Sequence, residues 1–198
     1  MAFVHNRHYH RTLLRRLPPH VDRALDAGCG RGEFAAKLAR RAERVDALDP
    51  DAEMVAAAKA RAPGNVHVRQ ADLLQADLEP GAYDYIDSIA VLHHMDLEAA
   101  FSTLRDALAP QGTLAVIGCY REATPADYAV ALVASPVNAV ARLAHAAART
   151  APDDSMPVAR PSTTLAEVRE VAGRVLPGAR IGRRLFWRYL LTYRKPAG

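Results

Sequence analysis

One short stretch decides the fold of this chain: Leu25-Asp26-Ala27-Gly28-Cys29-Gly30-Arg31-Gly32. Apolar residues of a short strand precede the glycines, and residues 33–40 after them have helical character. A strand, a glycine turn and a helix form the first nucleotide-binding crossover of an α/β sheet. The glycines are spaced G-x-G-x-G, and Glu33 stands where a dinucleotide fingerprint needs a third glycine. Because an acid at a helix N-terminus repels a pyrophosphate, the loop favours a ligand without phosphates.

Further strands are indicated downstream, and acids stand at the ends of two of them. Asp49 ends the second strand about 20 residues after the first glycine, which is the spacing of a ribose-binding carboxylate. Asp72 stands at the end of the third strand. A capping box at Thr164 opens a helix that runs to Leu176, and residues 179–194 alternate like two final strands. The second to fifth strands are predicted over residues 44–49, 66–73, 82–94 and 112–119.

Together these motifs resemble those of the class I S-adenosylmethionine (SAM)-dependent methyltransferases, in particular a small-molecule, type 11-like branch that includes ubiquinone- and menaquinone-biosynthesis enzymes. The resemblance covers the chain from about Leu25 to Lys195. It implies a Rossmann-like, doubly wound α/β sheet of seven strands, mostly parallel with the last strand antiparallel, in a single domain over residues 1–198. It rests on the order and spacing of Asp26-x-Gly28-x-Gly30-x-Gly32, Asp49, Ala71-Asp72-Leu73, Tyr83-Asp84 leading to Val91-Leu92-His93-His94, and Leu108-x-Pro110-x-Gly112.

The resemblance implies a SAM site, from which the product S-adenosylhomocysteine (SAH) is released. The backbone of Gly28 and Gly30 would pack against the methionine part of SAM, where a Cβ would collide. Asp26 would help to hold the ammonium group of SAM. Asp49 would bind the ribose hydroxyls, and Asp72 would accept a hydrogen bond from the adenine amino group. The apolar walls of the adenine site would be Pro50, Met54 and Leu73.

Two histidines follow the fourth strand, where the acceptor is expected to meet the cofactor. Since the unperturbed pKa of histidine is about 6.5, His93 or His94 could take a proton from a phenol, an alcohol or an ammonium group. Alternatively, one of them packs and bonds to the backbone. Asp87 departs from the family pattern, in which its position is usually apolar, so its carboxylate either meets an arginine or faces the cleft. Further candidates for contact with the acceptor are Tyr9, His10 and Tyr120.

Residues 120–161 are expected to form a helical insertion after the fifth strand. Thr124 and Pro125 suit a helix start, and two helices rich in alanine and valine would follow, over 126–134 and 137–149. Because ligands bind beyond the carboxyl ends of the strands, this segment is interpreted as a lid over an apolar or aromatic acceptor. A dimer surface or a helix pair resting on a bilayer are the alternatives. The proline between the helices argues against a membrane span.

Composition limits the alternatives. A chain of 198 residues suits one domain, and its two cysteines provide neither a disulfide framework nor zinc-ligand spacing, so no metal is expected. Residues 1–7 lack the apolar segment of a signal peptide, which predicts a cytoplasmic protein. The net charge of +4 comes mostly from arginine, and the clusters at 11–16 and 180–188 are interpreted as solvated faces.

The expected partner is a small-molecule acceptor with an oxygen or nitrogen nucleophile. Nucleic acid is disfavoured, because the fourth strand is not followed by an Asn/Asp-Pro-Pro-aromatic motif and no RNA-binding module is visible. An RNA or protein methyltransferase, a SAM-binding protein without catalysis and an NAD-dependent oxidoreductase are the alternative functions, and Glu33 disfavours the last. The sequence is compatible with a homodimer.

Overall fold

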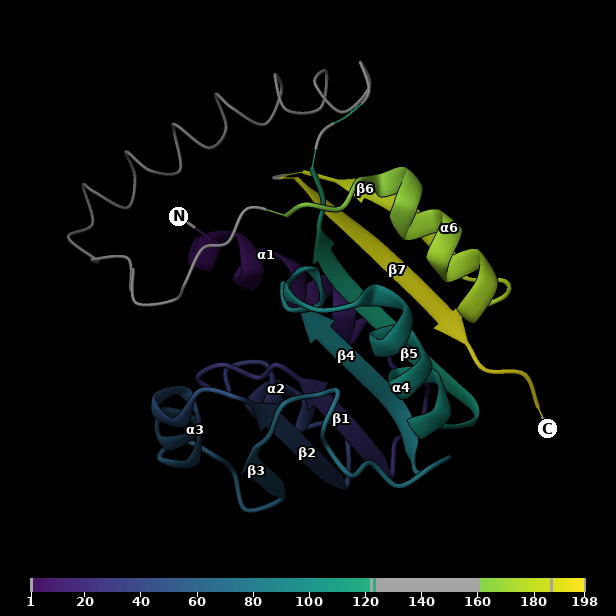
Figure 1. Cartoon of the computed structure of the whole chain (residues 1–198). Coiled ribbons are helices and arrows are strands. Elements are labelled where there is room, and N and C mark those ends of the chain that lie inside the picture. Colours follow the sequence, from purple (N-terminus) through teal and green to yellow (C-terminus); the bar gives the residue numbers. More distant parts are fainter. Residues whose placement is uncertain (1, 122, 124–160, 186, 198) are drawn as a thin grey trace.

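The computed structural model describes residues 2–121, 123, 161–185 and 187–197, with side chains from residue 8 onward. In these residues the chain forms a seven-stranded sheet with the strand order β3-β2-β1-β4-β5-β7-β6 (Figure 1). Neighbouring strands are parallel except at β7, which runs antiparallel to both β5 and β6. The predicted Rossmann-like sheet is therefore confirmed. The strands are β1 (Arg23–Ala27), β2 (Arg44–Asp49), β3 (Val66–Gln70), β4 (Tyr83–Ile89), β5 (Leu108–Cys119), β6 (Arg180–Arg184) and β7 (Arg188–Arg194).

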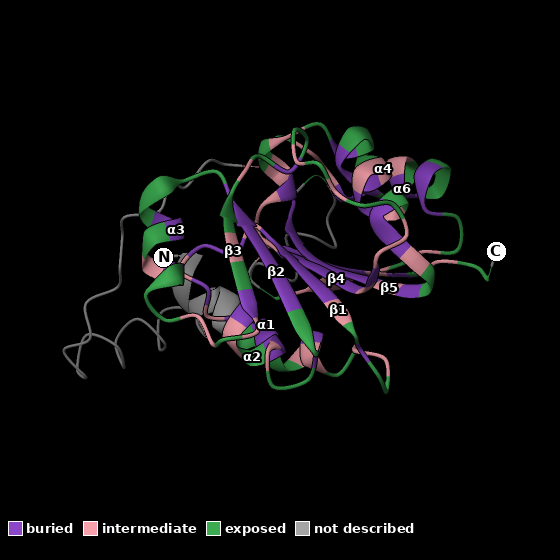
Figure 2. Ribbon diagram, turned by 90° about the horizontal axis from the view of Figure 1, so that it is seen from below, coloured by how far each residue is buried: buried purple, intermediate pink, exposed green. Residues whose placement is uncertain are grey.

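Helices cover both faces of this sheet (Figure 2). They are α1 (Ala2–Leu14), α2 (Ala35–Leu38), α3 (Ala52–Lys59), α4 (Leu97–Ala107) and α6 (Leu165–Val175), with a 3-10 turn, η1, over Leu92–His94. Side-chain caps fix several helix starts: Asp51 and Asp96 accept N–H groups of the first turns of α3 and α4. The capping box of α6 forms as predicted, between Thr164 and Glu167. Among the described helices, none is long and apolar enough to span a membrane.

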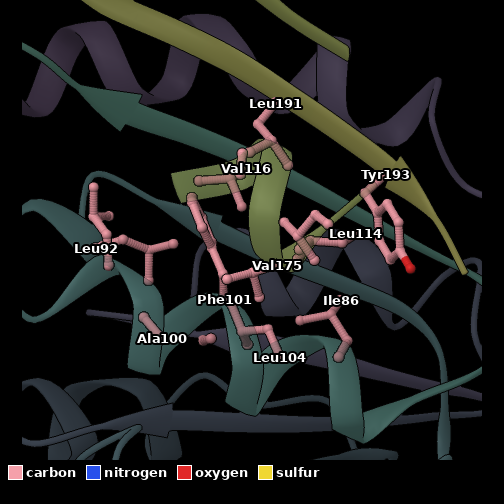
Figure 3. Close-up of a cluster of buried hydrophobic side chains, with 14 of the residues drawn as sticks. Ile86, Leu92, Ala100, Phe101, Leu104, Leu114, Val116, Val175, Leu191 and Tyr193 are labelled. Carbon is pink, nitrogen blue, oxygen red and sulfur yellow. The ribbon is translucent and has the colours of Figure 1, made fainter. Parts of the chain in front are cut away.

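The central strands are buried on both faces because apolar residues fill both sides of them. Along β5, Leu114 and Val116 belong to a cluster with α4 and α6, whereas Ala115 and Ile117 belong to a cluster with α1 and α2. The sequence of a strand buried on both faces is a continuous apolar run rather than an alternation of apolar and polar residues. Figure 3 shows the first cluster, in which side chains of α4, β5 and β7 meet.

Strand β7 inserts between β5 and β6, and a glycine makes room for one of its aromatic side chains. A Cβ added at Gly118 of β5 would collide with the ring of Tyr189 in β7. Tyr189 is consequently buried although it lies close to the end of the sheet. Strand β5 also begins earlier than the predicted Gly112, because Leu108 already pairs with Tyr83 of β4, ahead of an irregularity after which pairing resumes at Thr113.

The predicted lid over residues 120–161 lies largely outside the described residues, since 122 and 124–160 are not among them. The residues that flank it are held together: Arg121 pairs with Thr164 in an isolated parallel bridge, and its N–H donates to the carbonyl of Thr163 at 2.9 Å. Arg121 Nε also donates to the carbonyl of Ser162 at 3.2 Å. The chain therefore leaves the sheet and returns to it at one point, just beyond the carboxyl end of β5.

Candidate cofactor site

The glycine loop closes the carboxyl end of β1 against β2. Gly28, Gly30 and Gly32 all have positive φ, at 85°, 51° and 73°, which glycine adopts without steric cost. The N–H groups of Gly28 and Cys29 both donate to the carbonyl of Leu48 at 2.8 Å. A Cβ at Gly28 would collide with the side chain of Val91, which precedes η1. The loop thus brings its own backbone, the end of β2 and η1 together.

Asp49 lies at the end of β2, directly under this loop. Its Oδ2 accepts the N–H of Gly30 at 2.8 Å, and its Oδ1 accepts the N–H of Asp51 at 3.0 Å. Burial raises the pKa of Asp49, which those two hydrogen bonds lower. Because a carboxylate offers about four acceptor positions, two N–H bonds leave capacity for a pair of hydroxyl groups. The structure therefore places Asp49 where a ribose diol could bind.

Asp26 lies at the base of the loop and is 1% exposed. Its carboxylate accepts the N–H of Ala35 at the start of α2, but Oδ2 has no hydrogen-bond partner among the described residues. The pKa of Asp26 is raised to about 7. Burial is the largest cause, the charge of Asp49 adds to it, and the hydrogen bond from Ala35 acts in the opposite direction. A buried acceptor without a donor is costly in the absence of a cationic or donor ligand. Together with glycines that a Cβ would block, it fits the ammonium end of SAM.

The residues predicted around the adenine differ in their environment. Met54 and Leu73 are buried, each 5% exposed, and Pro50 is exposed. Asp72 is exposed as well, and its Oδ1 accepts the N–H of Leu74 at 2.8 Å, as a turn-forming acid does. The carbonyl of Pro50 accepts the side-chain amide of Gln70 at 3.1 Å, which ties the turn after β2 to the end of β3.

The two histidines of η1 have different surroundings. Their ring centroids lie 3.9 Å apart, with His93 half-buried and His94 exposed. Burial, together with the charges of His94 and Arg188, lowers the pKa of His93 to about 4. Nδ1 of His93 is buried and has no hydrogen-bond partner among the described residues. His93 is therefore neutral at pH 7 and able to accept a proton, although its low pKa makes it a weak base.

The three predicted acceptor contacts, Tyr9, His10 and Tyr120, are all buried. Tyr9 donates its hydroxyl to the carbonyl of Leu185 at 2.7 Å, and burial raises the pKa of Tyr9 to about 12. His10 lies with Nδ1 2.7 Å from Nζ of Lys37. Tyr120 is 1% exposed and belongs to the core cluster of α4 and α6. Tyr9 and Tyr120 are both buried, and they lie close enough for Tyr120 to raise the pKa of Tyr9.

Sequence reasoning missed Arg188, which was assigned to a solvated basic cluster. Arg188 is the register partner of Cys119, is 6% exposed, and contacts the sulfur of Cys119 through its guanidinium. Burial raises the pKa of the Cys119 thiol, and the nearby arginine lowers it. The signal that could have revealed Arg188 is its phase: it shares one side of β7 with Leu190, an apolar core residue.

Asp87 also lies in the interior. It is 0% exposed, and neither of its carboxyl oxygens has a hydrogen-bond partner among the described residues. Its register partner across the β1–β4 ladder is Asp26. The neighbour of Asp87 is thus a second acid of the candidate site, where the sequence had left open an arginine or the cleft.

A glycine loop and two acids gathered at the carboxyl ends of β1 and β2 define an α/β protein that binds a nucleoside-containing ligand. The family described as "Methyltransferase domain" matches residues 24–112 of the chain. An uncharacterised methyltransferase of Mycobacterium bovis is 34% identical over 96% of this chain and 96% of its own length. The chain therefore belongs to the class I SAM-dependent methyltransferases, and SAM is its cofactor.

One further relative and one structural neighbour are named for their activities. A trans-aconitate 2-methyltransferase of Rhizobium etli is 39% identical over 54% of this chain and 42% of its own length. The N-methyltransferase NodS of Bradyrhizobium japonicum, solved with SAH, has the same fold, with a TM-score of 0.65 at 20% identity over 96% of this chain and 87% of that one.

Proposed function

We propose that this methyltransferase acts on a small-molecule acceptor, apolar or aromatic, through an oxygen or nitrogen nucleophile. The observation that carries the proposal is the insertion point: the segment between Arg121 and Ser162 leaves and re-enters the sheet at the carboxyl end of β5. That is the edge at which the glycine loop and η1 lie, and ligands of open α/β sheets bind beyond it. The alanine- and valine-rich composition of the segment suits an apolar acceptor.

The candidate residues divide the work of holding the cofactor. Gly28 and Gly30 would lie against its methionine part, with Asp26 at the ammonium group and Asp49 at the ribose hydroxyls. Asp72 would accept from the adenine amino group. The apolar sides of the adenine would meet Pro50, Met54 and Leu73. In this proposal residues 1–198 form one domain, and residues 120–161 form its lid.

When bound, SAM supplies a methyl group on a positively charged sulfur, so the protein contributes alignment and exclusion of water. Positioning of that kind accounts for roughly 7–11 kcal/mol of a barrier. The acceptor would approach from the side of η1, where neutral His93 can receive a proton from it. His94, which is exposed, is the second candidate for that role.

Calorimetric titration with SAH, with NAD as the control ligand, tests the cofactor site first. Micromolar binding of SAH and no binding of NAD are expected. An acceptor screen with labelled SAM then compares phenols, quinols and small amines with RNA and peptide pools. Methylation confined to the small molecules supports the proposal, and methylation confined to RNA or peptide contradicts it.

A further inference from the structure

Two carboxyl groups lie side by side inside the sheet, below the glycine loop. Asp26 in β1 and Asp87 in β4 are register partners on neighbouring parallel strands. Both point to the face of α1 and α2, since Ala24 and Tyr85, two residues earlier, belong to the cluster on that face. Neighbouring strands are about 4.8 Å apart, so carboxyl groups on paired positions come within reach of each other.

These acids have too few partners for two buried charges. Both oxygens of Asp87 and Oδ2 of Asp26 are buried without a hydrogen-bond partner among the described residues. Two ionised carboxylates can only accept hydrogen bonds, so they cannot bond to each other. Their mutual repulsion and their burial both favour a proton on one of them. One acid of the pair is therefore expected to be neutral at pH 7.

The proton belongs on Asp87. Burial raises the pKa of Asp87 well above its usual range, and the charge of Asp26 raises it further. For Asp26, burial raises the pKa only to about 7, because the N–H of Ala35 stabilises its charged form. The better-supported anion is thus the one nearer the glycine loop.

Arg16 lowers the pKa of Tyr85 in this region, but the charge that acts on Asp87 itself is that of Asp26. Burial raises the pKa of Tyr85 and of Cys29, so both are neutral, and Asp49 adds negative charge from the end of β2. The basic groups His10 of α1 and Lys37 of α2 contact each other, with 2.7 Å between Nδ1 and Nζ. Further charged or titratable groups on the elements packed around this face are Tyr9, His8 and Arg11 of α1, Arg16 after it, and Arg31 and Glu33 of the loop before α2.

We infer that Asp87 is a positioning residue that donates its carboxyl O–H to Oδ2 of Asp26 and so keeps Asp26 ionised and aligned for the ammonium group of SAM. In this arrangement Asp87 needs no cation of its own, and Oδ2 of Asp26 accepts the carboxyl O–H with one lone pair and keeps the other for the ammonium group. The inference rests on the proposed contact between Asp26 and the ammonium group.

A pair of variants at one position separates this role from simple packing. Asp87→Asn keeps an N–H donor for Asp26, and Asp87→Leu removes it while placing there the apolar residue usual for the family. SAH binding at pH 7, measured by calorimetry, should stay within about twofold in Asp87→Asn and weaken about tenfold or more in Asp87→Leu, since a hydrogen bond to a charged group is lost. The Tm of ligand-free Asp87→Leu should rise by about 3–8 °C, because an apolar side chain replaces a buried polar one.

Opposite movement of affinity and Tm is the signature of a positioning role, because a structural role would lower both. Infrared spectra of the ligand-free protein at about pH 8.5, where Asp26 is ionised, should also show a protonated-carboxyl band that Asp87→Asn lacks. Unchanged SAH affinity in Asp87→Leu, equal loss in both variants, or absence of that band in the unmodified protein would each overturn the inference. Asp26→Asn distinguishes failure of the inference from failure of the proposed ammonium contact. Normal SAH binding by Asp26→Asn would contradict the contact itself. Weaker SAH binding by Asp26→Asn, with no effect of Asp87→Leu, would overturn the role of Asp87 alone.

Discussion

Buried acids occur at both ends of the parallel sheet, and their surroundings differ. Asp46, at the amino-end side of β2, accepts hydrogen bonds from Arg23, Arg44 and the hydroxyl of Tyr83, at 2.9–3.1 Å. Asp26, at the carboxyl end of β1, and its neighbour Asp87 together have three buried oxygens without a partner among the described residues. Both side chains are closed off from solvent, Asp46 at 2% and Asp26 at 1% exposure, although Asp26 lies deeper in the protein.

The pKa values follow this difference in partners. Burial alone would raise the pKa of Asp46, but the hydrogen bonds from Arg23, Arg44 and Tyr83 lower it below the usual value. For Asp26, burial prevails and the pKa rises to about 7. A buried acid with all its partners inside the protein stabilises the fold, and one that lacks them leaves an acceptor for a ligand. The amino-end acid is therefore structural, and the carboxyl-end acids are those that we propose for the cofactor site.

The largest expected effect is at the carboxyl end. Asp49→Ala should weaken SAH binding by about 2–4 kcal/mol, because two hydroxyl acceptors disappear and the N–H of Gly30 loses its partner. Calorimetric titration measures the change, with circular dichroism to establish that the variant is folded. SAH affinity within twofold of the unmodified protein would place the ribose elsewhere.

The amino-end acid should behave in the opposite way. Asp46→Asn should lower the free energy of unfolding at pH 7 by about 2–3 kcal/mol, discounted because both arginines are partly exposed, and should leave SAH affinity unchanged. The folded pKa of Asp46 is lowered, so its contribution is present above the unfolded pKa of about 3.9 and is lost as pH falls through the folded pKa.

Urea unfolding of both proteins at pH 7 and at about pH 3 measures this prediction, because the difference in unfolding free energy should shrink at the lower pH. A difference that stays constant with pH would mean that the charge of Asp46 contributes nothing. Asp106→Asn provides the control, since Asp106 is an exposed acid paired with Arg105.

A third experiment uses pH at the carboxyl end. The pKa of ligand-free Asp26 is about 7, so the carboxylate that meets the ammonium group is progressively protonated as pH falls through that value. SAH affinity should therefore fall about 20-fold between pH 7.5 and pH 5.5. Asp26→Asn should bind more weakly at pH 7.5 and show a much flatter profile. A steep profile in both proteins would assign the titration to another group.

The sequence was sufficient where one local rule governed the structure. Strand β2 has the predicted bounds, Arg44–Asp49, because its apolar run ends in an acid, and the helix of α6 follows from its capping box. The start of β5 was predicted late, since Pro110, Gln111 and Gly112 resemble a turn, although Leu108 already pairs with Tyr83 of β4 before an irregularity that ends at Thr113. Gln111 does adopt a positive φ of 62°, as the turn-like sequence indicates, but strand β5 extends across this irregular position.

The sequence predicted which acids lie near the glycine loop, but not how the buried residues around them pair. Spacing located Asp26 and Asp49 near the glycine loop, because the carboxyl ends of parallel strands share one edge. The pairing of Asp26 with Asp87 depends on the register of β1 against β4, which joins residues about 60 positions apart and leaves no local pattern. The burial of Arg188 likewise depends on where β7 enters the sheet.

The smallest effect is expected at His93, whose buried Nδ1 is another unpartnered group of the carboxyl end among the described residues. Burial lowers the pKa of His93 to about 4, so its ring is neutral throughout pH 6–8 and its protonated form is too acidic to be readily formed. His93→Ala should therefore lower kcat by less than about tenfold, and the rate should show no inflection from His93 between pH 6 and pH 8.

His94→Ala, on the exposed neighbour, is the matched control, and an acceptor found by the screen provides the assay. A loss of 100-fold or more confined to His93→Ala would instead make His93 the general base, because proton transfer in the transition state contributes about 10²–10⁴-fold. His93 would then be an orphaned group that serves the chemistry directly, whereas Asp26 and Asp87 serve the placement of the cofactor.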